Sequence, residues 1–164
     1  MEEVHYHDQI ASGRANVLGH GSYYFVHQPV MLDEVISSLN LKPGYIALDA
    51  TTGGGGHTIE ILKRILPGGL LIGLDADAST LAIAKERLKE YEGSFRLVRE
   101  NFRNLDTVLA SLGIDGIDAA LFDVGVSSFQ LDDAERGFGL KQDSRLDMRM
   151  DPELPVSAYD IINR

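Results

Sequence analysis

Apolar residues follow two alternating patterns along the chain. Four short, mainly apolar segments are expected to be strands; they occupy residues 45–48, 70–74, 95–98 and 117–122. The continuous apolar run over residues 70–74 is typical of a strand buried on both faces of a parallel sheet. Between them, apolar residues recur at helical spacing over residues 57–66, 81–91 and 105–112. Two further helices are predicted over residues 31–40 and 156–163. The alternation predicts an α/β fold, in which short right-handed crossovers join the strands into a doubly wound, mainly parallel sheet of order 3-2-1-4.

The predicted strand order reverses between the first and the fourth strand, where a ligand crevice is expected. The two loops richest in polar and glycine residues follow these two strands: residues 51–58, with four consecutive glycines, and residues 123–130. A glycine turn between a strand and a helix presents backbone N–H groups to a ligand, and glycine lets the ligand lie on the main chain. The sequence therefore predicts a binding site between the two loops.

An acid at the end of the second strand is expected to bind ribose hydroxyls. Asp75 lies nineteen positions after Gly56, close to the roughly twenty of nucleotide-binding folds. Asp77 is the alternative, although its position suits a helix N-cap at least as well. The sequence favours Asp75 for the ribose.

The glycine loop lacks the two common phosphate-binding fingerprints. The pattern G-x-G-x-x-G would need glycine at Thr58 or Ile59, and the chain contains no G-x-x-x-x-G-K-[ST]. A pyrophosphate ligand is therefore disfavoured, which argues against the alternative of a nicotinamide-dependent dehydrogenase domain. A nucleoside without phosphates fits better, and S-adenosylmethionine is the obvious one with reactive chemistry.

Composition narrows the class of protein further. Cysteine is absent, which excludes disulfides and thiolate zinc sites and is compatible with a cytoplasmic location. The formal net charge of −10 argues against a broad electrostatic grip on nucleic acid but allows a local basic patch. Candidates for such a patch are Arg136, Lys141, Arg145 and Arg149, although the acids between them favour an ion-pair network equally. No apolar run is long enough to span a bilayer, so no membrane partner is expected.

The two ends of the chain differ from its middle. Residues 1–24 mix His, Gly, Ser and Asn without periodicity, which predicts a flexible leader or tail. Residues 25–130 hold the alternating unit and form the predicted cofactor-binding domain. Regularity then fades, because residues 131–150 are polar, charged and glycine-containing and cannot form one helix or strand throughout.

Five blocks of sequence are unusual enough to indicate a family. They read HQPVMLDEV over residues 27–35, DATTGGGGHT over 49–58, GLDAD over 73–77, FDVGVSSFQLDDAERGF over 122–138 and LDMRMD over 146–151. In these blocks the chain resembles the bacterial 16S ribosomal RNA cytosine-N4 methyltransferase family (RsmH/MraW type). The resemblance covers about residues 27–163.

This resemblance implies a Rossmann-like, S-adenosylmethionine-dependent methyltransferase fold, and methylation of the N4 amine of a cytidine in 16S ribosomal RNA of the small ribosomal subunit. It implies cofactor contacts at Gly55, Gly56, His57, Asp75, Phe102, Asp123 and Gln130. Asp123 is in addition our candidate catalytic residue. A carboxylate that accepts the N–H bonds of the cytosine amine would localise the nitrogen lone pair, and Asp123 lies at the predicted crevice.

Members of the family are substantially longer than this chain, with a helical domain inserted after the fourth strand and further strands beyond it. We therefore expect a fold truncated after the fourth strand, with residues 131–164 forming a loop and the start of the inserted substrate-recognition region. The fourth strand would then be an exposed apolar edge, which predicts a longer parent protein or a homo-oligomer that masks it. The remaining alternative is a truncated, non-catalytic cofactor-binding fragment.

Overall fold

The computed structural model describes residues 15–18, 22–25, 29–141 and 143–164. Its centre is a sheet of four parallel strands: β3 (Ile46–Asp49), β4 (Leu70–Asp75), β5 (Phe95–Arg99) and β6 (Ala119–Leu121). The order is β5-β4-β3-β6, which confirms the predicted order 3-2-1-4. In this register Leu48 lies beside Ile72 of β4 and beside Ala120 of β6.

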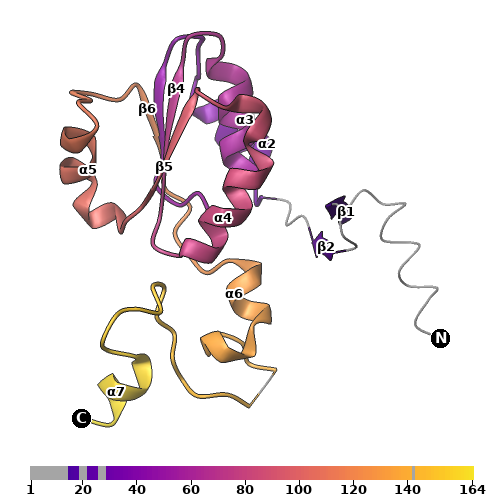
Figure 1. Ribbon diagram of the computed structural model, residues 1–164, viewed down its shortest axis with the longest axis vertical. Helices are drawn as coiled ribbons and strands as arrows, with labels where there is room; N and C mark the ends of the chain where they lie inside the picture. Colours follow the sequence, from indigo (N-terminus) through magenta and orange to yellow (C-terminus); the bar gives the residue numbers. More distant parts are fainter. Residues whose placement is uncertain (1–14, 19–21, 26–28, 142) are drawn as a thin grey trace.

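Helices cover both faces of the sheet (Figure 1). Three of them lie on one face: α2 (Leu32–Ser38), α3 (Gly56–Ile65) and α4 (Ala78–Arg87). The opposite face carries α5 (Leu105–Ser111). Because both crossovers from β3 to β5 lie on one side and the return to β6 lies on the other, the sheet is doubly wound as predicted.

The hydrophobic core has two layers, one on each face of the sheet. The layer under α2 and α3 contains Ile36, Ala47, Ile61, Leu62, Ile65, Leu71, Leu88 and Leu121. The layer under α5 contains Leu48, Ala50, Ile72, Leu74 and Val108. Neighbouring residues of β4 enter different layers, as Leu71 and Ile72 do, so this strand is apolar on both faces up to Leu74. Full burial of one such side chain stabilises the fold by about 1.5–3 kcal/mol.

Two predicted elements have different bounds in the structure. The fourth strand was expected over residues 117–122, but only Ala119–Leu121 pair with β3. At its start, the Asp118 carboxylate accepts a hydrogen bond from Ile46 N at 2.8 Å, so a side chain takes a position that the ladder would otherwise fill. The helix predicted over 81–91 ends at Arg87 and continues as a 3₁₀ turn, η1 (Lys89–Tyr91).

The segment after β6 extends away from the sheet as the orange-to-yellow part of Figure 1. It contains α6 (Ser128–Asp132), the 3₁₀ turn η3 (Ala134–Arg136) and α7 (Ala158–Ile162). The predicted helix near residue 160 is therefore confirmed. It begins with a capping box, in which the Ser157 hydroxyl accepts from Asp160 N and the Asp160 carboxylate accepts from Ser157 N.

Part of the predicted leader has regular structure. Strands β1 (Ala15–Leu18) and β2 (Ser22–Phe25) pair antiparallel, and the sequence did not predict this pairing. The rest of residues 1–24 lies outside the described residues. Within the described part of the chain, no helix combines the length and apolar character that a membrane crossing requires.

Candidate functional site

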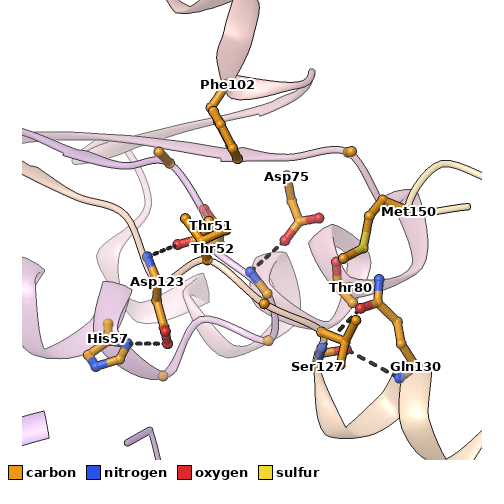
Figure 2. Close-up of a pocket in the computed structure, with 18 of the residues that line it drawn as sticks. Thr51, Thr52, His57, Asp75, Thr80, Phe102, Asp123, Ser127, Gln130 and Met150 are labelled. Atoms are coloured by element: carbon orange, nitrogen blue, oxygen red, sulfur yellow. Dashed lines mark hydrogen bonds and ion pairs between the residues drawn. The ribbon is translucent and has the colours of Figure 1, made fainter. Parts of the chain in front are cut away.

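A cavity of about 470 Å³ opens at the carboxyl ends of the strands (Figure 2). Its walls come from the glycine loop (residues 50–56), the end of β4, the loop that enters the 3₁₀ turn η2 (Phe102–Asn104), and the β6 loop (residues 122–127). The two loops singled out by the sequence therefore face one another at the predicted reversal of strand order. The volume suits a small-molecule ligand.

Asp49, the last residue of β3, holds the start of the glycine loop in place. Its carboxylate is buried at 1% exposure and accepts from Thr58 Oγ1 at 2.7 Å and from Thr51 N at 3.2 Å. Burial raises the pKa of Asp49, and the hydrogen bonds from Thr58 and Thr51 oppose that rise. One acid thereby ties the end of β3, the loop and the first turn of α3 together.

Two of the glycines are required by the packing of the loop. Gly55 has a φ of 81° as the N-cap of α3, a left-handed conformation that glycine adopts without strain. A Cβ atom at Gly56 would overlap Pro29. Gly56 lines the cavity, whereas Gly55 does not. The left-handed conformation of Gly55 turns the chain into α3.

Asp75 lies at the end of β4, with its carboxylate on the cavity. Oδ2 accepts from Gly53 N at 2.7 Å and Oδ1 from Asp77 N at 2.9 Å. Burial raises the pKa of Asp75, although these two hydrogen bonds lower it. A carboxylate with two oxygens has more acceptor sites than these bonds use, so it can also accept from a diol.

Asp77 has a different role from Asp75. It is the N-cap of α4, where its side chain accepts from Ser79 N at 3.0 Å, and it does not line the cavity. Burial pushes the pKa of Asp77 up, but hydrogen bonds from Ser79, Arg136 and Gln130 outweigh it and hold the pKa below its ordinary value. The structure thus separates the two acids that the sequence left as alternatives.

An aromatic ring forms the wall opposite the glycine loop. Phe102 begins η2 and is 38% exposed, and it packs edge-on against Phe122 with ring centroids 5.7 Å apart. Its other surface is on the cavity (Figure 2). Beside it, the Glu100 carboxylate accepts from Asn101 N at 2.7 Å and also lines the cavity.

His57 and Asp123 meet where α3 begins and the β6 loop leaves the sheet. His57 Nδ1 lies 3.8 Å from Asp123 Oδ2, which is an ion-pair separation if the imidazole is protonated and is longer than a hydrogen bond. His57 is 7% exposed, and its Nε2 has no hydrogen-bond partner among the described residues. Asp123 is more open, with 57% of its side chain exposed. Its backbone N donates to Thr51 Oγ1 at 2.8 Å, which joins the two loops directly.

Gln130 lies in α6, directly after the β6 loop. Its side chain accepts from Ser127 N at 2.9 Å and donates to Asp77 Oδ2 at 3.1 Å. At 5% exposure, both ends of the amide are engaged within the protein, although the residue lines the cavity. Its visible role is to hold the loop in place.

Six of the seven site residues expected from the sequence thus come together on one cavity. They are Gly56, His57, Asp75, Phe102, Asp123 and Gln130. Sequence reasoning missed Arg87, Glu100 and Met150, which also line it. Glu100 precedes Phe102 by two positions and could have been found from the strand-end rule, but no local pattern marks the other two.

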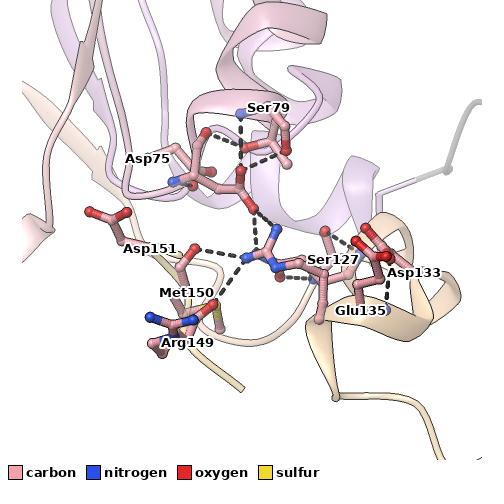
Figure 3. Close-up of polar contacts among 12 residues, drawn as sticks. Asp75, Ser79, Ser127, Asp133, Glu135, Arg149, Met150 and Asp151 are labelled. Atoms are coloured by element: carbon pink, nitrogen blue, oxygen red, sulfur yellow. Dashed lines mark hydrogen bonds and ion pairs between the residues drawn. The ribbon is translucent and has the colours of Figure 1, made fainter. Parts of the chain in front are cut away.

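Met150 reaches the cavity because a half-buried arginine, Arg136, holds its segment. Figure 3 shows the polar contacts around Met150. The Arg136 guanidinium donates to Asp77 Oδ2, and also to the carbonyl oxygens of Arg149 at 3.0 Å and Met150 at 2.9 Å. Arg149 in turn pairs with Asp147 at 2.7 Å. Arg136 and Arg149 therefore belong to an ion-pair network, one of the two roles that the sequence left open for them.

Comparison with known proteins places the chain in one family by two routes, a family profile and individual relatives. The sequence profile described as the MraW methylase family matches residues 24–164. A ribosomal RNA small subunit methyltransferase H of Lachnospira eligens is 51% identical over 139 residues, which are 85% of this chain and 44% of that protein. The protein of the same name from Brevibacillus brevis is 48% identical over the same shares of the two chains.

Solved structures resemble the chain more distantly. The crystal structure of an rRNA methylase from Streptococcus thermophilus has a TM-score of 0.48 and 21% identity, and the match covers 62% of this chain and 58% of that one. The chain spans less than half the length of the curated relatives that it matches.

Proposed function

This chain belongs to the MraW methylase family, whose cofactor is S-adenosylmethionine, and we propose that its cavity binds this cofactor for methylation of the N4 amine of a cytidine in 16S ribosomal RNA. The observation that carries the proposal is the cavity between the glycine loop and the β6 loop, with Asp75 and Phe102 on its walls. The relatives named ribosomal RNA small subunit methyltransferase H support the RNA substrate. The small ribosomal subunit is the proposed partner, and the cytoplasm the proposed location.

The residues on the cavity fit an adenosine. The Asp75 carboxylate keeps acceptor sites beyond its two backbone hydrogen bonds, as binding of the two ribose hydroxyls requires. The free surface of the Phe102 ring offers an apolar wall for adenine. Gly56 allows the ligand to approach the start of α3 closely, and His57 and Gln130 complete the wall around it.

Methyl transfer depends mainly on positioning and on the local electric field. When bound, S-adenosylmethionine supplies a methyl group already activated by its sulfonium sulfur. The work left to the protein is to bring a poor nucleophile into line, because the lone pair of a cytosine amine is delocalised into the ring. The cytosine base must leave any stack of bases to reach a cofactor in this cavity.

Asp123 is the proposed acceptor for the cytosine amine. Its exposed carboxylate can accept an N–H hydrogen bond, localise the nitrogen lone pair and take up the positive charge that develops on nitrogen. The hydrogen bond from Asp123 N to Thr51 Oγ1 holds this group at the crevice, and His57 Nδ1 lies 3.8 Å from its carboxylate. Ser127, which also lines the cavity, is placed to contact the base.

Two measurements test the proposal. Equilibrium dialysis with labelled S-adenosylmethionine and with NAD compares the two nucleotide ligands, and we expect binding of the first only. Labelled methyl groups are then followed into small ribosomal subunits, with the Asp123→Asn variant as control. Transfer that is lost in the variant supports the full proposal; binding without transfer by the wild type reduces it to a cofactor-binding module, and binding of NAD contradicts it.

A further inference from the structure

One wall of the cavity carries a cation that has no acidic partner in the described part of the chain. Arg87 ends α4, is partly buried and lines the cavity. Its guanidinium donates to Gly54 O, and it forms no ion pair with a carboxylate of the described residues. The other partly buried arginines, Arg136 and Arg149, pair with Asp77 and Asp147. Burial lowers the pKa of Arg87. A partly buried, unpaired guanidinium is costly unless a ligand provides the anion.

The position of Arg87 extends the cavity along α4. Thr80, Ile83 and Arg87 line it together, at a spacing that places them on one face of the helix. The middle of α4 lies against the glycine loop, because a Cβ at Gly55 would be 3.4 Å from Ala84 Cβ. This face of α4 and the glycine loop therefore form one continuous wall.

The glycine loop holds two opposite charges at neighbouring residues. Asp75 accepts from Gly53 N, and Arg87 donates to Gly54 O. Neighbouring Cα atoms are about 3.8 Å apart, so the acid and the cation are hydrogen-bonded to two consecutive residues of one loop. A ligand that places hydroxyls on Asp75 and continues along the loop would meet the guanidinium next.

The charges on the cavity match the ends of the cofactor. Its acids are Asp75, Glu100 and Asp123, and Arg87 is its one permanently charged cation among the described residues. S-adenosylmethionine has hydroxyls and two cationic groups for acids, and a single carboxylate at its amino-acid end for a cation. We propose that Arg87 binds this carboxylate and so selects ligands that carry an amino-acid end. This inference rests on the proposed function.

The chemistry of arginine suits this role. The guanidinium is a planar fork of N–H donors that matches a carboxylate with two parallel hydrogen bonds, and the bond to Gly54 O uses only part of it. The bond to Gly54 also fixes the fork, so little side-chain freedom is lost when the ligand binds.

The test compares two ligands that differ only at the amino-acid end. S-adenosylhomocysteine has it, and 5′-methylthioadenosine lacks it but keeps the adenosine and the sulfur. Binding of both is measured by calorimetry to the wild type, to Arg87→Met and to Arg96→Met, an exposed arginine outside the cavity. We expect Arg87→Met to weaken the binding of S-adenosylhomocysteine by about ten- to a hundredfold and to change the binding of 5′-methylthioadenosine by less than about twofold. Arg96→Met should change neither affinity.

Equal loss of both ligands in Arg87→Met, or no loss of either, would overturn the role of Arg87. Should the variant not fold, decarboxylated S-adenosylmethionine against the wild type provides the same comparison, since it lacks only the carboxylate; affinity equal to that of S-adenosylmethionine overturns the inference. A wild type that binds neither adenosine ligand contradicts the proposed function itself. The two failures are therefore distinguishable.

Discussion

The ion pair between buried Asp77 and half-buried Arg136 leads us to expect a large effect from one substitution outside both layers of the core. Arg136→Met replaces the apolar stem of arginine by an unbranched apolar side chain and removes the guanidinium. It leaves the Asp77 carboxylate, 3% exposed in its side chain, without a counter-charge. It also leaves the carbonyl oxygens of Arg149 and Met150 without their donor.

The size of the effect follows from what remains around Asp77. Removal of one partner of a buried ion pair typically costs about 3–5 kcal/mol. Asp77 keeps hydrogen bonds from Ser79 and Gln130, which places the loss at the lower end. We therefore expect the free energy of unfolding to fall by about 3 kcal/mol, which corresponds to a decrease in Tm of roughly 6–12 °C for a chain of this length.

Thermal and urea unfolding, followed by circular dichroism, measure this loss. The matched control is Arg64→Met, which breaks an exposed ion pair with Glu60 and should cost no more than about 1 kcal/mol. If both variants lose the same small amount, Arg136 does not hold the segment around Met150 as described.

Three further predictions follow from single contacts. Gly56→Ala should destabilise the protein by about 1–3 kcal/mol, since its Cβ would overlap Pro29, whereas Gly116→Ala, with open space around it, should be nearly neutral in the same urea titration. The pKa of Asp77 is lower in the folded state, so its stabilisation is complete at neutral pH and is lost as pH falls below the unfolded value of about 4; unfolding curves of Asp77→Asn should show a weaker loss of stability in acid, and an equally steep loss would refute this. Strand β6 is an edge of the described sheet; if a second copy rather than a longer parent protein masks it, light scattering should detect self-association that Ala120→Lys reduces, and a monomeric wild type would contradict masking by a second copy.

The sheet and its helices were predictable because burial on two faces leaves a strong local signal. Leu71 and Ile72 belong to different core layers, and this is what makes the run over residues 70–74 continuously apolar. The hairpin of β1 and β2 was not predicted, because the segment around residues 15–25 mixes Gly, His, Ser and Asn with its apolar residues and shows no periodicity. The extent of β6 depends on where its partner β3 ends, which its own sequence does not contain.

The sequence could predict those residues of the site whose positions are set by the ends of the strands. Strand ends and the reversal of strand order locate Asp75 and Asp123, and the structure then separates Asp75 from Asp77 by the N-cap of α4. Arg87 and Met150 could not be predicted, because each reaches the cavity through contacts distant in sequence. Arg87 depends on the packing of α4 against the glycine loop, and Met150 on the bond from Arg136.

The central claim is that the glycine loop and the β6 loop together hold an adenosine-bearing methyl donor against Asp75. Calorimetry with S-adenosylmethionine on the wild type, Asp75→Ala and the exposed control Asp115→Ala tests it most directly. The account predicts that Asp75→Ala weakens binding at least about tenfold, because two hydroxyl hydrogen bonds to a charged group are lost, and that Asp115→Ala binds like the wild type. Equal affinity in all three proteins would contradict it.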